Sequence, residues 1–327
     1  MEETPDIDPR RRRAPTPRWR WPATAALVLA LTAGSAAVTA SMAAPQQVQP
    51  TGVAVGDDAP VVLPAPVLVH ATPAPTPIPG GQVRAAGGCI NVPIVYYHYI
   101  RVNPVATDHL GFELSVTPQH FQAQRDWLRI AGGHPVTLAQ VMAAIGGGPP
   151  LPPHPVVLTF DDGHDDFATR AVPILLSEHF VATTFVVPGF LGAATYMTTA
   201  QVKEVAGDGM VVGAHTMHHV SLIKVSLALA KAEIDGSKAY LEQLLGEPVL
   251  DFAYPYGTNN AAVDSLVAAA GFRDAAATSW GTLQCTANRY ALHRLEIMGS
   301  FSVSAFAVAA GVAAPPPNWT DPGLITH

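Results

Sequence analysis

Short apolar runs alternate with amphipathic segments from about residue 89 to the end of the chain. Runs without a polar face are typical of strands that are covered on both sides. We expect strands over residues 93–99, 156–160, 182–187, 210–214, 250–254, 274–278 and 292–297. Apolar residues at helical spacing predict helices over residues 117–130, 137–145, 171–179, 200–206, 226–245 and 261–270.

Strands that alternate with helices predict an α/β fold with a parallel sheet. About seven strands are expected between residues 89 and 297, which favours a single (β/α) barrel, distorted and seven-stranded. We expect this barrel domain to occupy residues 89–327. No internal repeat is visible in the sequence.

The N-terminal 44 residues differ from the rest of the chain in charge and hydrophobicity. Six arginines within residues 1–22 precede an apolar run without charge over residues 23–44. About 20 apolar residues cross a bilayer as a helix, and arginines on the N-terminal side predict a cytoplasmic tail with the rest of the chain exported. The run is therefore either a single-pass transmembrane anchor or the apolar region of a cleaved signal peptide. The first alternative predicts a membrane protein and the second a secreted one.

A proline-rich tract follows over residues 45–88 and shows neither helical nor strand periodicity. Proline fixes φ and removes backbone donors, so this tract is expected to be an extended, semi-rigid linker. Two cysteines, Cys89 and Cys285, stand near the ends of the predicted domain. An exported chain permits a disulfide between them, but two separate buried thiols remain the alternative.

Charge excludes one class of partner. The formal net charge is −7, and basic residues cluster only in the first twenty residues. Binding to a nucleic-acid backbone needs a basic patch or stripe on the folded domain. No nucleic-acid partner is therefore expected.

Two carboxylates, Asp161 and Asp162, come directly after the apolar run 156–160 and before a glycine. In parallel α/β folds, functional side chains gather at the carboxyl ends of strands. Adjacent carboxylates repel each other, so a metal cation is the expected compensation, and one of the two can then act as a general base. The alternative is an exposed turn that caps the next helix.

Two histidines, His215 and His219, follow the apolar run 210–214. A spacing of four places both imidazoles on the same side of a helical turn, and His218 between them should point elsewhere. No glutamate follows His215, which excludes the zinc-protease pattern. Together with Asp162 they provide two nitrogens and one carboxylate oxygen, which is the ligand set of a catalytic zinc site with a position left open for water.

These residues resemble the polysaccharide deacetylases with a NodB-homology domain, carbohydrate esterase family 4. The first family motif is intact as Thr159-Phe160-Asp161-Asp162-Gly163, and the second is intact as His215-Thr216-Met217-His218-His219. The resemblance covers residues 90–297. The Tyr-His strand at residues 93–98 is similar to that of the exopolysaccharide and poly-N-acetylglucosamine deacetylase branch.

The resemblance implies a role for each motif residue. Asp161 would be the general base, while Asp162, His215 and His219 would bind a divalent metal, most often zinc. The backbone N–H of Tyr256 would stabilise the tetrahedral oxyanion. Substrate would contact Pro255, Tyr256 and Trp280.

The remaining family motifs are imperfect. The arginine that normally braces the catalytic aspartate is replaced by Ala253, so the bracing arginine is expected to be absent. Ser279 stands where an acidic partner normally precedes Trp280. His293 is the candidate general acid, with a structural histidine as the alternative. His98 is expected to be a packed histidine that supports other residues.

The function that follows is metal-dependent removal of N-acetyl groups from an N-acetylglucosamine-containing polysaccharide. One alternative is an O-acetyl esterase on acetylated xylan, because the same attack cleaves an ester. Another is a non-catalytic carbohydrate-binding protein of the cell wall. Phosphoryl transfer with magnesium is disfavoured because two histidines indicate a softer metal.

Overall fold

The computed structural model describes residues 82–105 and 107–325. The predicted basic tail, the apolar run 23–44 and the linker up to residue 81 lie outside these residues. Among the helices of the described ranges, none has the length and apolar character needed to cross a bilayer. The expectation of a membrane anchor therefore stays a prediction.

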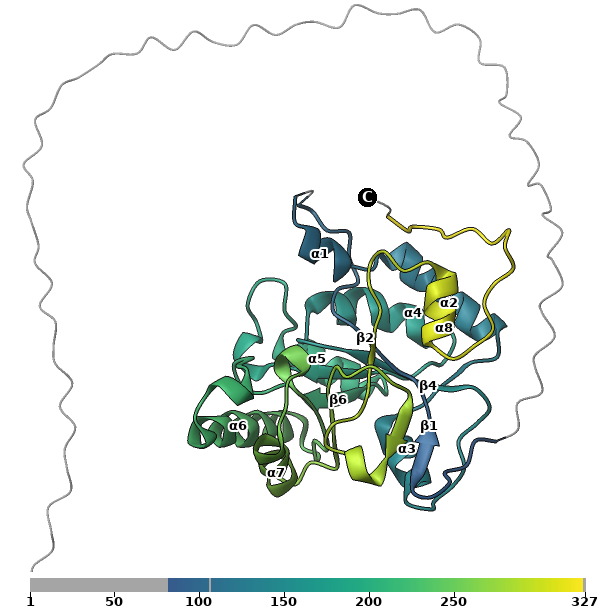
Figure 1. The fold of residues 1–327 in the computed structure, drawn as a ribbon. Helices are drawn as coiled ribbons and strands as arrows, with labels where there is room; N and C mark the ends of the chain where they lie inside the picture. Colours follow the sequence, from purple (N-terminus) through teal and green to yellow (C-terminus); the bar gives the residue numbers. More distant parts are fainter. Residues whose placement is uncertain (1–81, 106, 326–327) are drawn as a thin grey trace, which may run out of the picture. The chain divides into compact units, whose positions relative to one another are not determined.

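A curled sheet of parallel strands forms the centre of the domain (Figure 1). Its strands follow the order β10-β2-β4-β5-β6-β7-β8, and β3 pairs with the first two residues of β4. They are β2 (Ile94–Tyr97), β3 (His134–Pro135), β4 (Pro155–Phe160), β5 (Thr183–Val186), β6 (Val211–Ala214), β7 (Asp251–Ala253), β8 (Asp274–Ala276) and β10 (Leu295–Glu296). The prediction of an α/β fold with a parallel sheet is confirmed.

The two ends of this sheet approach each other. Leu292, shortly before β10, forms a parallel bridge with Ala276 of β8. The segment predicted as one strand over residues 292–297 therefore has two partners. Leu292 forms the bridge to β8, and Leu295 and Glu296 pair with β2. The result is a curled sheet that agrees with a distorted (β/α) barrel.

Helices cover the outside of the sheet. They are α1 (His109–Glu113), α2 (Pro118–Ile130), α3 (Leu138–Ile145), α4 (Val172–Leu176), α5 (Thr199–Gly207), α6 (Leu227–Leu245), α7 (Ala261–Ala269) and α8 (Val303–Ala309). Helix α8 packs against α2, and α6 packs against both α5 and α7. Figure 1 shows these two groups at different sides of the sheet.

Side-chain caps fix where several helices begin. Thr117 accepts a hydrogen bond from the His120 N–H at the start of α2, as the sequence predicts. Thr137 begins α3 with a capping box, in which Gln140 returns a bond to the cap residue. Each such cap is worth about 1 kcal/mol. These local signals explain why both helices begin where the sequence predicts.

The helix predicted over residues 171–179 has different bounds. A π-helical turn, η1 (Phe167–Ala171), leads into α4, which ends at Leu176. Pro173 has no N–H and so cannot donate the bond that an α-helix needs at that point. The wider turn thus stands before the proline. Helix α1 has only five residues, too few for a periodic signal in the sequence.

The inside of the barrel is filled by large side chains from alternate strand positions. Phe185 of β5 is fully buried, and its ring lies against Gly213 of β6. A Cβ at position 213 would stand 2.5 Å from that ring. A glycine is therefore required on β6, because any side chain there would displace the aromatic ring that fills the interior.

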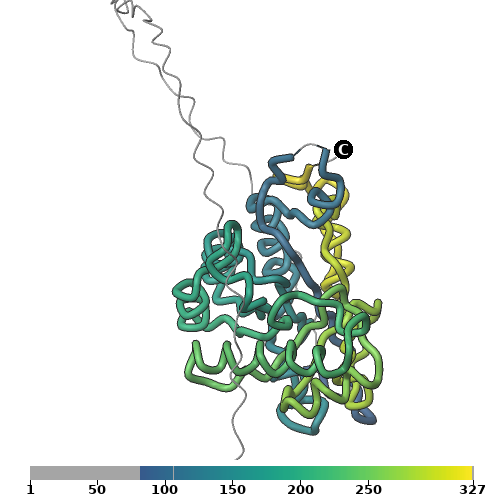
Figure 2. Tube along the Cα trace, turned by 90° about the vertical axis from the view of Figure 1, so that its left-hand side faces the viewer, coloured from purple at the N-terminus to yellow at the C-terminus, as the bar shows by residue number. Residues whose placement is uncertain are grey.

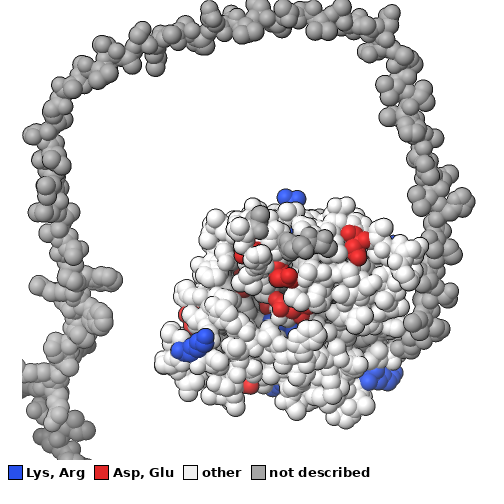
Figure 3. All heavy atoms as spheres, turned by 45° about the horizontal axis from the view of Figure 1, so that its top comes forward, with Lys and Arg blue, Asp and Glu red and all other residues white. Residues whose placement is uncertain are grey.

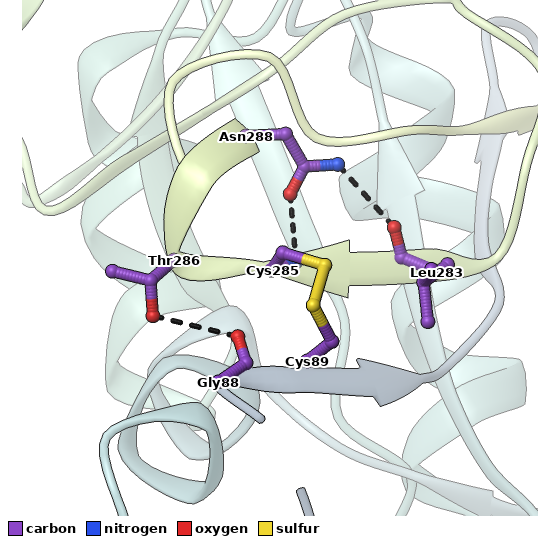
Figure 4. Close-up of a disulfide and its surroundings, with 6 residues drawn as sticks. All are labelled: Gly88, Cys89, Leu283, Cys285, Thr286 and Asn288. Atoms are coloured by element: carbon purple, nitrogen blue, oxygen red, sulfur yellow. Dashed lines mark hydrogen bonds between the residues drawn. A yellow bond between two sulfur atoms is a disulfide. The ribbon is translucent and has the colours of Figure 1, made fainter. Parts of the chain in front are cut away.

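A second, two-stranded sheet lies at the other end of the barrel from the site described below. Strand β1 (Cys89–Asn91) pairs antiparallel with β9 (Leu283–Cys285), and a disulfide joins Cys89 to Cys285 (Figure 4). Asn288 accepts from the Cys285 N–H and donates to the Leu283 carbonyl. The alternative of two free thiols is therefore excluded. Closing a loop of 196 residues stabilises a fold by about 5 kcal/mol on the chain-entropy estimate.

Both ends of the described chain contact the domain. Val83 and Leu151 exchange backbone hydrogen bonds of 2.9 Å, so the last residues of the predicted linker lie against the fold. The C-terminal segment runs back beside α2 (Figure 2). There the Trp127 indole donates to the Ala313 carbonyl at 2.8 Å, and the Thr117 hydroxyl donates to the Gly323 carbonyl.

Two buried carboxylates lie at the first residues of neighbouring strands. Asp251 begins β7 and Asp274 begins β8, and Arg273 contacts both. Burial raises the pKa of Asp274 well above its usual range, and the neighbouring Asp251 carboxylate adds to the rise. Burial also raises the pKa of Asp251, although Arg273 opposes the rise. The Arg273 guanidinium thus contacts two carboxyl groups that are buried away from water.

We expect Asp274→Asn to stabilise the protein at neutral pH. Because the pKa of Asp274 is higher in the folded state, Asp274 does not lower the free energy of unfolding at a pH below its pKa in the unfolded chain. The free energy of unfolding falls as pH rises through the folded-state pKa. Asparagine removes this loss, so the variant should gain about 1 kcal/mol over wild type at pH 7 and little at pH 4. Urea denaturation at both pH values measures the difference.

Asp235→Asn on the exposed face of α6 is the matched control, and its stability relative to wild type should not depend on pH in this way. A variant destabilised equally at both pH values would show instead that Arg273 needs the charge of Asp274.

Candidate active site

A cleft of about 330 Å³ opens where the strands end, next to α1. Its walls include Asp161, Asp162, His215, His219 and Tyr256, so the structure brings five of the predicted site residues together. Figure 3 shows acidic side chains gathered around a hollow near the middle of this face, while most basic side chains lie toward its edges.

The predicted metal ligands meet at one point. The Asp162 Oδ1 atom lies 3.4 Å from His215 Nε2 and 3.2 Å from His219 Nε2. One ligand atom from each of the three residues lies within 4.8 Å of the others. Asp162 Oδ1 is buried and has no hydrogen-bond partner among the described residues.

The protonation of His215 shows why this arrangement fits a cation. Its Nδ1 lies 2.7 Å from the Ala253 carbonyl, which can only accept, so Nδ1 carries the proton. In the neutral ring, Nε2 then presents a lone pair to the Asp162 carboxylate. Two acceptors facing each other repel, and a metal ion between them removes the conflict. The three residues therefore fit a divalent metal.

Asp162 is ionised in this setting. Burial would raise its pKa, but His164, His215 and His219, which donate to the carboxylate when the facing ring nitrogen is protonated, outweigh burial and hold the pKa well below its usual range. His164 is buried and approaches the second carboxylate oxygen, Oδ2, at 3.5 Å. The carboxylate therefore keeps its negative charge for a cation.

The loop that carries both histidines has an unusual backbone. Thr216 and His219 have φ angles of 61° and 56°, which is the left-handed region. Such conformations cost about 1 kcal/mol or more for residues other than glycine, so the surrounding structure must hold them.

Glu233 of α6 supplies much of that support. Its carboxylate accepts from the His218 N–H at 2.8 Å and from His218 Nδ1 at 2.9 Å, and its carbonyl accepts from the Met217 N–H. His218 therefore points away from the metal ligands, as the sequence predicts. The exact placement of His219 depends on these bonds.

Asp161 is held by an arginine that the sequence analysis did not assign. The Arg294 guanidinium donates from Nη1 to Oδ1 and from Nη2 to Oδ2, both at 2.8 Å. Arg294 is fully buried, donates also to the Ala277 carbonyl, and lies 4.4 Å from the centre of the Tyr96 ring. The expectation that the bracing arginine is absent was therefore wrong.

The reason for that error is topological. The family motif places the arginine at position 253, where the structure has an alanine whose carbonyl holds His215. Arg294 comes 41 residues later and directly precedes β10. Strand β2 lies between β10 and β4 in the sheet. A pattern tied to sequence spacing does not find a residue that arrives from another strand.

The same arginine sets the charge state of Asp161. Burial would raise the pKa of this carboxyl, but the Arg294 guanidinium and the nearby His215 outweigh it and lower the pKa below its usual value. Asp161 is thus a buried carboxylate with both oxygens oriented. Each oxygen keeps a lone pair that can accept a proton.

His98 lies on the wall of the cleft, although the sequence analysis treated it as a packed histidine. It follows β2, and its Nδ1 lies 3.8 Å from Glu296 Oε1 of β10. Its side chain is 20% exposed, so it reaches both the cleft and its carboxylate partner. The signal in the sequence was its place at the carboxyl end of a buried strand.

The other predicted residues lie elsewhere. His293, Trp280 and Pro255 do not belong to the wall of this cleft. Pro255 is buried, whereas the Tyr256 side chain is 64% exposed and its ring centre lies 4.8 Å from that of His219. His293 contacts the Ser279 hydroxyl instead of Asp161 or Asp162.

We expect Arg294→Met to lower the free energy of unfolding by about 3–5 kcal/mol, because it leaves the buried Asp161 carboxylate without a partner. The double variant Arg294→Met/Asp161→Asn should regain part of this loss, since no unpaired charge remains. Urea denaturation measures both. Arg289→Met, which changes an exposed arginine, is the control and should alter stability by about 0.5 kcal/mol or less. A double variant no more stable than Arg294→Met would contradict the assignment.

Comparison with known proteins gives the family. Residues 148–275 match the sequence profile described as polysaccharide deacetylase. The putative polysaccharide deacetylase YxkH of Bacillus subtilis is 26% identical over 215 residues, which is 66% of this chain and 74% of that protein. A poly-β-1,6-N-acetyl-D-glucosamine N-deacetylase of Escherichia coli is 50% identical over 62 residues, which is 19% of this chain but only 9% of that protein.

Solved structures show the same fold. The Streptococcus pyogenes deacetylase PplD, in complex with acetate, has a TM-score of 0.62 and 29% identity, over 67% of this chain and 97% of that chain. IcaB from Ammonifex degensii has a TM-score of 0.59 at 24% identity, over 71% of this chain and 98% of that chain. Together with the geometry of the cleft, these matches show that the chain contains a polysaccharide deacetylase domain.

Proposed function

We propose that this protein is a metal-dependent hydrolase that removes N-acetyl groups from an N-acetylglucosamine-containing polysaccharide. One observation carries the proposal: the cleft places an ionised, oriented carboxylate, Asp161, next to an Asp-His-His set that fits a divalent metal. Zinc is the usual metal for two imidazoles and one carboxylate. The poly-N-acetylglucosamine deacetylases among the relatives support this substrate class.

Each residue of the cleft has a distinct task in this reaction. A divalent ion held by Asp162, His215 and His219 would supply Lewis-acid chemistry. Asp161 accepts a proton from the attacking water, and Arg294 keeps its two oxygens oriented. The acetyl C–N bond breaks, acetate leaves with the water oxygen, and the sugar amine takes up a proton.

His98 is the proposed donor of that last proton. It lines the cleft beside Asp161, and Glu296 faces its Nδ1. Without a proton the nitrogen would leave as a strongly basic anion, so a proton donor in this position is needed before the C–N bond breaks. This assignment replaces His293, which contacts Ser279 outside the cleft.

Tyr256 is proposed to act through its backbone. Its φ of 60° turns the peptide at the edge of the cleft, directly after Pro255. Its N–H would donate to the carbonyl oxygen as negative charge develops there, a contact worth several kcal/mol in comparable sites. The exposed Tyr256 ring is placed to contact the sugar.

Two alternatives are an O-acetyl esterase, which would act on a different substrate, and a binding protein, which would release no product. An O-acetyl esterase would use the same base and metal, but a sugar alkoxide leaves more readily than an amide anion, so the reaction would depend less on His98. A non-catalytic binding protein would need neither the oriented base nor the metal ligands, yet the chain keeps all of them.

An extracellular location is part of the proposal. The arginine-flanked apolar run at residues 23–44 supports export, with either an anchored or a released domain. The Cys89–Cys285 disulfide supports it as well, because such bonds persist in oxidising compartments.

Acetate release across acetylated glycans tests the function. Purified full-length protein, loaded with zinc or stripped by a chelator, should release acetate from poly-N-acetylglucosamine only when a metal is present. Asp161→Asn should lower kcat by about 10³-fold or more while leaving the fold intact. Asp165→Asn, a nearby carboxylate outside the cleft, is the matched control. Full activity after verified metal removal would refute the proposal, and preference for acetylated xylan would favour the esterase.

His98→Asn should separate the proton donor from the rest of the machinery. We expect kcat on an N-acetylated sugar to fall by about 10²-fold, because the amine must be protonated as it leaves. The kcat of the variant on an aryl acetate ester should fall far less, because the phenolate leaves without taking up a proton. Glu296→Gln should show the same pattern with a smaller effect. Equal losses on both substrates would rule out the role.

A further inference from the structure

Tyr96 contacts both charged pairs of the cleft. It belongs to β2, is 7% exposed, and forms part of the cleft wall. The Arg294 guanidinium carbon lies 4.4 Å from the centre of its ring, and the centre of the His98 ring lies 5.6 Å from the same point. Tyr96 therefore lies against the arginine that orients the base and against the proposed proton donor.

The Tyr96 hydroxyl interacts with Glu296. The two residues are paired in the neighbouring parallel strands β2 and β10. Burial raises the pKa of the Tyr96 hydroxyl, and Glu296 raises it further through its charge and a hydrogen bond, although Arg294 opposes the rise. The hydroxyl therefore keeps its proton and donates a hydrogen bond to the Glu296 carboxylate, which lies 3.8 Å from His98 Nδ1.

Arg294 and Glu296 are two residues apart in a short extended segment. Side chains at such positions point to the same side of the chain, and opposite charges attract strongly where little water separates them. Within the described ranges, however, Arg294 forms its ion pair with Asp161, and Glu296 forms its own with His98. If Arg294 and Glu296 paired with each other instead, the base would lose its donor and His98 its carboxylate.

We propose that Tyr96 is a positioning residue that keeps these two ion pairs separate. Its ring covers the Arg294 guanidinium, which leaves the guanidinium to Asp161, and its hydroxyl holds Glu296 within reach of His98. This inference rests on the proposed function, because it concerns the base and the proton donor of that reaction.

The exposure of the two pairs agrees with this role. The Arg294 and Asp161 side chains are 0% and 5% exposed, whereas those of His98 and Glu296 are 20% and 31% exposed. The ion pair on the base is strongest when water is excluded, but a proton donor must regain its proton from water after each turnover. Tyr96 contacts both pairs and lies where the buried one meets the partly exposed one.

Tyr96→Phe removes the hydroxyl and keeps the ring over Arg294. With zinc-loaded full-length protein, we expect kcat on an N-acetylglucosamine oligomer to fall by about tenfold, because Glu296 is no longer held beside His98. The KM for that oligomer and the kcat on an aryl acetate ester should change by about twofold or less, since the phenolate needs no proton and the base is untouched. Steady-state kinetics on the two substrates measure the difference.

Coupling to Glu296 distinguishes positioning from a general structural effect. If the hydroxyl acts through Glu296, the double variant Tyr96→Phe/Glu296→Gln should lose no more kcat on the oligomer than Glu296→Gln alone.

Tyr97→Phe is the matched control. It also removes a buried tyrosine hydroxyl from β2, one that donates to Gln124 Oε1 at 3.0 Å. Adjacent residues of a strand point to opposite faces of the sheet. The variant should therefore lower the urea midpoint but leave both kcat values within about twofold of wild type.

Tyr96→Leu removes the aromatic ring as well. Arg294 is then able to turn to Glu296, so kcat should fall on the aryl acetate ester too, by about tenfold. Replacing Glu296 by glutamine in this variant removes the competing charge, so Tyr96→Leu/Glu296→Gln should regain most of the activity on the ester. The same double variant should stay slow on the oligomer, because the carboxylate beside His98 is gone.

The outcomes separate this inference from the proposed function. Equal losses of kcat on the oligomer and the ester in Tyr96→Phe, or losses that multiply with those of Glu296→Gln, would overturn the role of the hydroxyl while the proposed function stands. An ester activity of Tyr96→Leu that Glu296→Gln does not restore would overturn the role of the ring. If the wild type releases no acetate from any glycan, the proposed function fails and this inference fails with it.

Discussion

A buried arginine and a buried aspartate determine much of how this domain is built. Two charges without water need partners in close geometry, because an unpaired one costs several kcal/mol. Arg294 and Asp161 meet that demand with two parallel hydrogen bonds of 2.8 Å. The bond joins the segment that closes the barrel to the end of the central strand β4, so closure of the sheet also orients the Asp161 carboxylate. A barrel left open at this point would leave the carboxylate alone.

The three proposed metal ligands present the opposite case. Here the chain brings together a carboxylate oxygen and two imidazole nitrogens, which repel each other when all three are acceptors. Hydrogen bonds from neighbouring residues hold the two histidines in place. The Ala253 carbonyl fixes the tautomer of His215, and Glu233 fixes the loop before His219. A divalent cation between these groups would remove the repulsion, so their arrangement fits a metal site better than an exposed turn.

The sequence predicted what depends on local signals. Uninterrupted apolar runs located β4 and its neighbours, Thr117 and Thr137 located helix starts, and the two intact motifs located Asp161, Asp162, His215 and His219. It failed where residues meet through topology. Arg294 takes the place of the arginine that the family motif has where this chain has Ala253, and His98 approaches Glu296 because β2 and β10 are neighbours. Such contacts between distant segments leave no trace in residue spacing.

The disulfide also governs how the domain responds to a mechanical pull. Any force applied through the chain that precedes Cys89 passes into β9 through the covalent bond, in addition to the short strand β1. The weak backbone pairing of Val83 with Leu151 would separate first. Strand β2, which starts just after this disulfide and leads to His98, therefore carries only part of the load. The disulfide thus divides a pull on this end of the domain between β1 and β9, so no single strand bears all of it.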